Sequence, residues 1–213
     1  MQHWLIVNKL KLIKIWYALL IAWFLFFLVS IPLLGIRQWV WLGQKSASIS
    51  IVVFWLTLMP GILKRFKITG VLLPLRTVMM LYRRQMGITM YVFALTHHWW
   101  VRFLPILKIN GDFWQFSLFE WIGFTAFVLL TPVFITSNEW SVRTLGHFWR
   151  TLHALVYIVV WLLFLHIALQ GTSWQAFVTL VVASLETFSL IWDKLKNPPV
   201  APLVQQEPIK TLP

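Results

Sequence analysis

The segment "GHFWRTLHALVYIVVWLLFLHIAL", residues 146–169, indicates the fold class of the whole chain. It contains a run of about twenty predominantly apolar residues, the length that an α-helix needs to cross the hydrocarbon core of a bilayer. Two histidines, His153 and His166, lie in this run thirteen positions apart. A polar ring in hydrocarbon needs a partner, so histidines inside a span are candidates for function. The segment therefore predicts a membrane helix that carries a site.

The composition places the chain among integral membrane proteins. Of its 213 residues, 60% are hydrophobic and only 11% are charged, and the mean hydropathy is +0.78. These values lie far outside the range of soluble domains. The chain has no cysteine, which excludes disulfides, thiolate metal sites and cysteine-ligated iron–sulfur clusters. Any metal must therefore be bound by histidine or carboxylate side chains.

Hydropathy averaged over about 19 residues predicts an all-α fold, an integral membrane bundle of six transmembrane helices. The predicted spans are residues 15–35, 47–63, 85–106, 114–136, 152–170 and 174–192. The first is longer than the apolar part of a signal peptide and lacks a cleavage pattern, so we expect it to be retained. One membrane domain, residues 1–196, is followed by a Pro-rich tail, residues 197–213, that we expect to be disordered and cytoplasmic.

The basic residues predict the orientation of the chain, whose formal net charge is +12. If the N-terminus is cytoplasmic, fourteen of the eighteen lysines and arginines fall in cytoplasmic segments and four fall in external loops. Because these residues accumulate on the cytoplasmic side of membrane proteins, we expect both termini to be cytoplasmic. This placement beside the spans explains the positive net charge, so the charge does not indicate that the chain binds nucleic acid. We expect these lysines and arginines to contact membrane lipid.

Two histidines on different predicted spans are expected at one level of the bilayer. His97 lies thirteen residues after Arg84, or about 20 Å along the third span. His166 lies sixteen residues after Arg150, or about 24 Å along the fifth span, which runs in the same direction. Imidazole rings at one level on two helices can bind a haem iron from both sides. His98 could replace His97, although its side chain points about 100° away on the helix.

These histidines also have a simpler interpretation, because interhelical hydrogen bonds or placement at the membrane interface would explain them too. The sequence gives little support for ion transport or for nucleotide binding. Glu186 is the exception to a near absence of carboxylates in the spans, so an acidic ion pathway is poorly supported. The sequence has no G-x-G-x-x-G, P-loop or nucleophile motif, which indicates that it has no nucleotide site of its own.

His153 lies near the predicted inner edge, about 20 Å from His166, a spacing that suits a second redox centre. Thirteen residues of ideal helix turn the two side chains about 140° apart, so a bend or a bulge is needed for both to face one partner. At the level of His153, the third span has Arg83 and Arg84 in place of a histidine. The sequence therefore predicts one complete haem site and one incomplete inner site.

The inner site has one further candidate ligand, His147, in the loop before the fifth span. Four arginines are expected to converge at this edge: Arg83, Arg84, Arg143 and Arg150. Guanidinium groups pair with haem propionates or with the phosphate of a flavin. The simpler interpretation is that they are the ordinary positive charge of a cytoplasmic edge.

The run "ITSNEWSVRTLGHFWRTLHALVY", from Ile135 to Tyr157, resembles the segment that joins spans four and five in ferric reductase-like transmembrane proteins. Among these it is most similar to the haem-binding membrane subunits of bacterial protein-methionine-sulfoxide reductase systems. The motif "YRRQMG", with His97 thirteen residues after its second arginine, and the motif "LTLMPGILKRF" also resemble that family. The matching residues of the longer run are Thr136, Ser137, Ser141, Arg143, Leu145, Gly146, Trp149, Leu152, His153, Val156 and Tyr157. His166 follows, and the resemblance extends over about residues 45–170.

The resemblance implies an electron-transfer subunit of the bacterial inner membrane that is not catalytic alone. It implies that His97, His153 and His166 take part in binding one or two haems b. Because Arg83 and Arg84 replace a histidine of the larger relatives, FMN or FAD is the alternative at the inner site. The implied electron donor is a cytosolic flavin reductase, and the implied acceptor is a periplasmic molybdenum-cofactor reductase that repairs oxidised methionines.

Two other functions stay open on the sequence. The chain could be a haem-binding anchor of another respiratory or photosynthetic complex. It could also be a purely structural membrane subunit, whose histidines only form hydrogen bonds between helices.

Overall fold

The computed structural model describes residues 2–68, 70, 72–112 and 114–197. In these ranges all regular secondary structure is helical, which confirms the predicted all-α class. The predicted disordered tail, residues 197–213, lies outside the described residues except for residue 197. Its disorder, and the single membrane domain before it, stay predictions.

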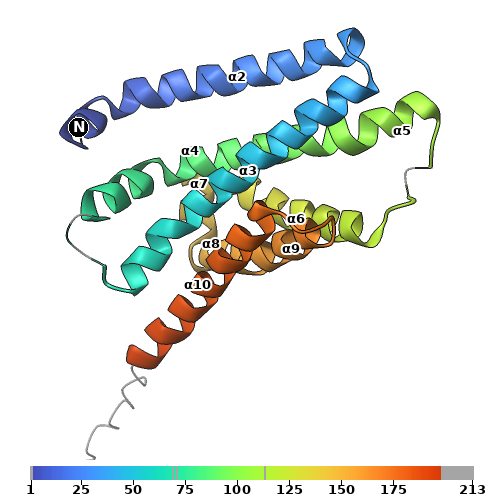
Figure 1. The fold of residues 1–213 in the computed structure, drawn as a ribbon. Helices are drawn as coiled ribbons and strands as arrows, with labels where there is room; N and C mark the ends of the chain where they lie inside the picture. Colours follow the sequence, from blue (N-terminus) through green and yellow to red (C-terminus); the bar gives the residue numbers. More distant parts are fainter. Residues whose placement is uncertain (1, 69, 71, 113, 198–213) are drawn as a thin grey trace, which may run out of the picture.

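The helices follow one another as shown in Figure 1. They are α1 (Gln2–Val7), α2 (Lys9–Leu33), α3 (Ile36–Arg65), α4 (Leu72–His98), the π-helix η1 (Trp99–Phe103), α5 (Leu104–Ile109), α6 (Leu118–Ile135), α7 (Glu139–Leu145), α8 (His147–His153), α9 (Val156–Ala168) and α10 (Trp174–Lys196).

Five helical stretches in the described ranges are long and apolar enough to cross a membrane: α2, α3, α6, the α8–α9 stretch His147–Ala168, and α10. They correspond to five of the six predicted spans. The third predicted span falls on α4 and η1, which are not among the five. α4 contains Arg76, Arg83 and Arg84 and ends in two histidines, and these side chains lower its hydropathy. The count of six spans therefore stays a prediction.

α3 and α4 both begin well before the spans predicted from hydropathy. α3 starts at Ile36 and not near residue 47, and α4 starts at Leu72 and not near residue 85. Polar residues such as Gln44 and Lys45 lower the hydropathy of the early part of α3, but their helix propensity is good. Hydropathy therefore locates the apolar part of each helix and not its ends.

The fifth predicted span is interrupted between its two histidines. α8 ends at His153, α9 begins at Val156, and a turn at Ala154 and Leu155 separates them. The sequence required a bend or a bulge only if both histidines were to face one partner. In the structure they line two different cavities, His166 the one and His153 the other.

α3 runs through the middle of the bundle and packs against both α4 and α10. Phe54 of α3, Leu130 of α6 and Val159 of α9 are buried together in the main core. The Ser50 hydroxyl of α3 donates a hydrogen bond of 2.9 Å to the carbonyl of Met90 in α4. This bond holds α3 and α4 together beside the cavities described below.

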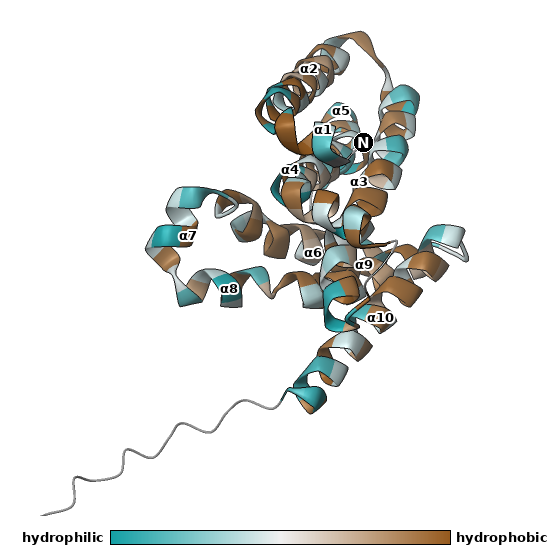
Figure 2. Cartoon of the chain, turned by 90° about the vertical axis from the view of Figure 1, so that its left-hand side faces the viewer, coloured by the Kyte–Doolittle hydropathy of each residue, from teal (hydrophilic) through white to brown (hydrophobic). Residues whose placement is uncertain are grey.

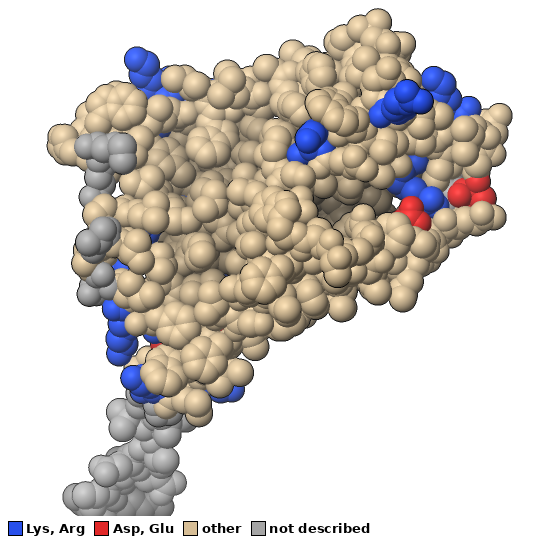
Figure 3. All heavy atoms as spheres, viewed as in Figure 1, with Lys and Arg blue, Asp and Glu red and all other residues tan. Residues whose placement is uncertain are grey.

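α2 lies against α4 through two tryptophans seven residues apart. Trp16 Nε1 donates to Thr89 Oγ1 at 2.6 Å, and Trp23 Nε1 donates to Thr96 Oγ1 at 3.4 Å. Elsewhere α2 exposes large apolar side chains such as Leu19, which is 66% exposed. Figure 2 shows hydrophobic residues, in brown, along the other long helices as well. On the face drawn in Figure 3, most Lys and Arg side chains lie toward the margins, with a broad uncharged region between them. Apolar surface of this extent marks contact with a membrane or a partner.

A buried ion pair joins α10 to the end of α3. Glu186, which is 2% exposed, pairs with Arg65. Arg65 Nε also donates to Ser189 Oγ at 2.8 Å, and that hydroxyl donates to the carbonyl of Glu186 at 2.8 Å. The carboxylate that stood out in the sequence is therefore part of a contact between helices.

We expect the substitution Glu186→Ala to destabilise the folded chain by about 3–5 kcal/mol, because it leaves the buried Arg65 guanidinium without a counter-charge. The unfolding midpoint of the detergent-solubilised chain measures this effect. The matched control is Glu139→Ala, which removes a pair with Arg143 whose side chains are 80% and 82% exposed, and it should leave the midpoint unchanged. Equal unfolding midpoints for Glu186→Ala and Glu139→Ala would show that the pair of Glu186 and Arg65 does not stabilise the fold.

Candidate functional site

Three histidines line one cavity of about 520 Å³ between α3, α4, η1, α6, α9 and the start of α10. They are His97, His98 and His166, and we call this space the paired-histidine cavity after His97 and His166. Apolar side chains such as Ile51 and Phe127 form much of the rest of its wall. A mostly apolar cavity with a few convergent polar groups is typical of a binding site for a small molecule or a cofactor.

His97 and His166 are anchored in the same way. His97 Nδ1 lies 2.9 Å from the carbonyl oxygen of Gly43, and His166 Nδ1 lies 2.7 Å from the carbonyl oxygen of Phe119. A carbonyl oxygen can only accept a hydrogen bond, so in each ring Nδ1 carries the proton and donates it. The lone pair of each neutral ring therefore lies at Nε2, and at His166 this atom accepts a bond of 3.2 Å from the side-chain amide of Gln170.

Gly123 makes room for the ring of His166. A Cβ atom at this position would lie 2.5 Å from His166 Nδ1 and 2.6 Å from Cε1, which is closer than any non-bonded contact allows. Phe119, whose carbonyl accepts the bond from His166, is on the preceding turn of the same helix. The first turns of α6 therefore supply both the acceptor and the space that hold His166 in place.

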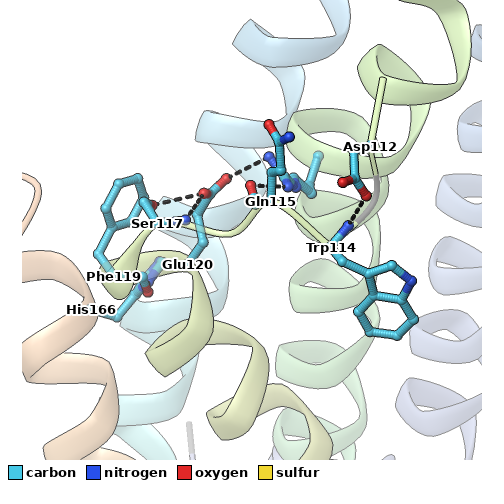
Figure 4. A network of polar contacts seen from close by, with 8 residues as sticks. Asp112, Trp114, Gln115, Ser117, Phe119, Glu120 and His166 are labelled. Atoms are coloured by element: carbon cyan, nitrogen blue, oxygen red, sulfur yellow. Dashed lines mark hydrogen bonds and ion pairs between the residues drawn. The ribbon is translucent and has the colours of Figure 1, made fainter. Parts of the chain in front are cut away.

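The start of α6 is itself fixed by Glu120, as Figure 4 shows. Its Oε2 accepts hydrogen bonds from the backbone nitrogen and the hydroxyl of Ser117, at 2.8 and 2.7 Å, so the side chain caps the helix as in a capping box. Its Oε1 forms an ion pair of 3.2 Å with Arg102 of η1. Arg102 also donates to the carbonyl of Gln115 at 2.6 Å. These contacts tie η1 to α6 at the edge of the paired-histidine cavity.

His98 is held differently from the other two histidines. Its ring stacks on Phe124 and Phe127, with ring centroids 5.5 and 5.4 Å apart. Its Nε2 is buried and has no hydrogen-bond partner in the described part of the chain. It lacks the carbonyl anchor of His97 and His166, so its position does not repeat theirs.

Three arginines and His153 line a second cavity of about 610 Å³, which we call the arginine cavity. The arginines are Arg83, Arg84 and Arg150. Met90 and Leu130 line this cavity and the paired-histidine cavity alike, so the two spaces are neighbours. Arg84 and His97 are thirteen residues apart on α4, or about 20 Å along the helix. The two cavities therefore follow one another along α4.

His153 has a different environment from His97 and His166. Its ring stacks on Trp149 with centroids 3.9 Å apart, and its Nε2 lies 3.2 Å from Thr136 Oγ1. The Thr136 hydroxyl donates its hydrogen to the carbonyl of Pro132 at 2.7 Å, so toward His153 it accepts. Nε2 of His153 then carries the proton, and the lone pair lies at Nδ1, the reverse of the arrangement in His97 and His166.

The structure brings together most of the residues that the sequence singled out. His97 and His166 share one cavity, and His153 shares the other with Arg83, Arg84 and Arg150. Two candidates lie apart from both cavities. Arg143 is exposed and faces Glu139 at 3.9 Å, and the exposed His147 lines neither cavity.

Other residues that support the histidines did not stand out in the sequence, namely Gly43, Arg102, Phe119, Glu120 and Gly123. The spacing S-x-x-E at Ser117 was a usable signal for the capped start of α6. The two carbonyl acceptors left no signal, because every residue has a carbonyl group. In the described ranges, no three His, Cys, Asp or Glu side chains group together as metal ligands.

Residues 42–164 match the family model described as ferric reductase like transmembrane component. The chain belongs to this family. The matched range contains His97, His153 and most of the lining of both cavities, and it ends two residues before His166. Together with the apolar helices, membership of this transmembrane family indicates a multi-pass membrane protein.

The chain is also similar to several proteins named "Protein-methionine-sulfoxide reductase heme-binding subunit MsrQ". The one from Bordetella pertussis is 32% identical over 145 residues, which cover 63% of this chain and 70% of that protein. Those from Agrobacterium fabrum and Brucella anthropi are 35% and 34% identical over 118 and 115 residues, or 51% and 52% of this chain. The matches span about half of those two proteins, 54% and 51%. No solved structure matches the chain.

We expect Glu120→Ala to loosen the first turn of α6, because it removes both the cap on Ser117 and the ion pair with Arg102. Amide hydrogen exchange of Ser117 and Trp121, whose N–H groups bond to the Glu120 carboxylate and to the Ser117 carbonyl, should become about fivefold faster, as for the loss of about 1 kcal/mol of capping. Glu120→Gln is the control, since glutamine also completes a capping box, and it should exchange nearly as slowly as the wild type. Equal exchange in the alanine variant and the wild type would show that the cap does not hold this turn.

Proposed function

We propose that the chain is a membrane electron-transfer subunit that binds haem b between His97 and His166. The observation that carries this proposal is their common anchoring, because both rings donate Nδ1–H to a backbone carbonyl and have their lone pair at Nε2 in one cavity. Histidine ligands of metals typically donate their other ring nitrogen to a carbonyl or a carboxylate, which fixes the tautomer. The names of the relatives, which are haem-binding subunits, support the same cofactor.

The residues of the cavity fit this cofactor in three ways. Two neutral histidines complete the coordination of an iron whose other four ligands belong to a tetrapyrrole. The aromatic and aliphatic wall suits a flat apolar ring and keeps water from it. Gly123 and the carbonyl of Phe119 hold His166 in one orientation. When bound, a haem iron with two histidine ligands carries one electron at a time.

We propose that the arginine cavity binds a second redox cofactor with anionic groups, either another haem or a flavin, FMN or FAD. Arg83, Arg84 and Arg150 would pair with propionates or phosphate, and the stacked rings of Trp149 and His153 offer a flat surface beside them. His153 would also have to ligate through Nδ1 or give up its contact with Thr136. His166 must also give up a contact, that of Nε2 with the Gln170 amide, but its lone pair already lies at this atom. His153 must ligate through Nδ1 or change its tautomer, and this difference favours the flavin, while a haem with a single histidine ligand is the alternative.

The two neighbouring cavities support a path for electrons along α4. We propose that a cytosolic flavin reductase supplies electrons at the arginine cavity. A periplasmic molybdenum-cofactor reductase acting on oxidised methionine would accept them near the paired-histidine cavity, and the subunit would not be catalytic alone. The names of the relatives, which are haem-binding subunits of a protein-methionine-sulfoxide reductase, support the reaction of the acceptor. The flavin reductase and the molybdenum cofactor are what the family resemblance implies. This assignment places the chain in a bacterial inner membrane with both termini in the cytoplasm, as the basic residues predict.

The purified chain should show the reduced-minus-oxidised absorption bands of a b-type haem, and the oxidised form should be low-spin. His97→Ala and His166→Ala should each abolish the low-spin signal, because each removes one axial ligand. His98→Phe is the matched control, since it keeps a ring between Phe124 and Phe127, and it should retain the signal. A chain without b-type bands would refute the proposal and leave a structural role for the histidines. Loss of the signal in His98→Phe alone would move the ligand to His98.

Gly123→Ala should weaken the same low-spin signal, because the added Cβ would displace the ring of His166. The control is Gly87→Ala, which lies on the arginine cavity and whose added Cβ would meet no atom within 4 Å. It should leave the low-spin signal intact. Equal signals in the two variants would show that the position of His166 does not depend on Gly123.

The cofactor of the arginine cavity can be identified by extracting haem and flavin from the purified chain. We expect one haem and one flavin per chain, and loss of the flavin alone in the Arg84→Gln and Arg150→Gln variants. The control is Arg143→Gln, since Arg143 lies outside the cavity. Two haems per chain without flavin would refute the flavin assignment, and one haem without a second cofactor would refute the role of this cavity.

A further inference from the structure

Two buried polar atoms without partners belong to residues that line the paired-histidine cavity. They are Nε2 of His98 and Nε of Arg102, and neither has a hydrogen-bond partner in the described part of the chain. A buried donor without an acceptor is destabilising, so such atoms are uncommon unless a ligand satisfies them. Both atoms can donate a hydrogen bond, so a single acceptor group could satisfy both of them.

Arg102 is already held rigidly by its other nitrogens. Nη1 pairs with Glu120 at 3.2 Å, Nη2 donates to the carbonyl of Gln115 at 2.6 Å, and the guanidinium lies 4.5 Å from the ring centre of Phe116. The side chain is 18% exposed. A guanidinium fixed in this way loses little entropy when it binds a further group. Nε is the nitrogen that these contacts leave without a partner.

His98 is placed to donate and not to ligate. The stacking on Phe124 and Phe127 fixes the plane of its ring, but no backbone carbonyl selects its tautomer as in His97 and His166. With the proton at Nε2, the ring donates from the same wall as Arg102. Arg102 follows His98 by four residues and belongs to the π-helix η1, which His98 directly precedes and whose turn is wider than that of an α-helix.

We infer that His98 and Arg102 form a carboxylate-binding corner of the paired-histidine cavity, which takes a propionate group of the haem. This inference rests on the function proposed above and assigns the polar edge of the same cofactor. Haem b is an apolar macrocycle with propionate groups at one edge, and a carboxylate accepts hydrogen bonds at both of its oxygens. The propionate bound at this corner would fix the rotation of the haem macrocycle between His97 and His166. It would also accept hydrogen bonds from Nε2 of His98 and Nε of Arg102.

The test compares two forms of the cofactor that differ only in this group. The full-length chain in detergent is titrated with haem b and with its dimethyl ester, in which the propionates have no charge. The signal is the low-spin spectrum that depends on His97 and His166. The wild type should bind the free acid at least about tenfold more tightly than the ester, as expected for the loss of one charge-assisted hydrogen bond.

Variants then assign the preference to the corner. His98→Phe and Arg102→Gln should each reduce the preference for the free acid about threefold or more while keeping the low-spin spectrum. Arg143→Gln is the matched control, because it removes an exposed arginine that does not line the cavity and keeps both donors, and it should retain the preference. If Arg102→Gln does not fold, His98→Phe with its conserved ring stacking still decides the question.

The outcomes separate the two proposals. Equal affinity of the wild type for the acid and the ester, or an unchanged preference in His98→Phe and Arg102→Gln, would overturn the corner and leave the ligand assignment intact. If neither the free acid nor the dimethyl ester produced the low-spin spectrum, the proposed function itself would be overturned.

Discussion

The hydrogen bond from His166 Nδ1 to the carbonyl of Phe119 is the contact on which the arrangement of the site depends. It can form only because position 123 has no side chain, and only if the first turn of α6 stays closed. Glu120 closes that turn and joins it to Arg102. The bond of His166 and the contacts of Glu120 together connect the end of α9, the start of α6 and η1. The corresponding bond of His97 to Gly43 connects α4 to α3, so the helices that pack the core also set the orientation of both rings.

Within this frame, the two cavities differ in the chemistry they can accept. The paired-histidine cavity offers two neutral nitrogens with fixed lone pairs and an apolar wall, which selects a metal inside a flat ring. The arginine cavity offers positive charge, stacked rings and one histidine whose Nε2 is engaged. Because Met90 and Leu130 belong to both walls, a substitution at either residue would affect both cavities. This closeness suits a relay in which electrons pass between neighbouring cofactors.

Much of this arrangement could be predicted from the sequence, and what could not has clear physical reasons. Apolar runs located five membrane-spanning stretches, and residue counts from flanking arginines placed His97 and His166 at one level. The same counts predicted a bend or a bulge if His153 and His166 were to face one partner, whereas the structure gives each of them a cavity of its own. Hydropathy did not locate the starts of α3 and α4, because polar residues continue a helix without contributing apolar surface. It also could not reveal the acceptors of the ring protons, since a backbone carbonyl is not encoded by any residue type.

The choice between His97 and His98 shows why geometry was needed. The sequence places them side by side, and a rotation of 100° per residue leaves open which of them faces the partner helix. The structure separates them by the second nitrogen of each ring: a carbonyl holds Nδ1 of His97, whereas two phenylalanine rings hold His98 and leave Nε2 without a partner. A ligand to a metal needs a fixed tautomer, and a donor to a carboxylate needs only a proton at the right atom. The two adjacent histidines thus fit two roles at one cofactor, His97 at its metal and His98 at its polar edge.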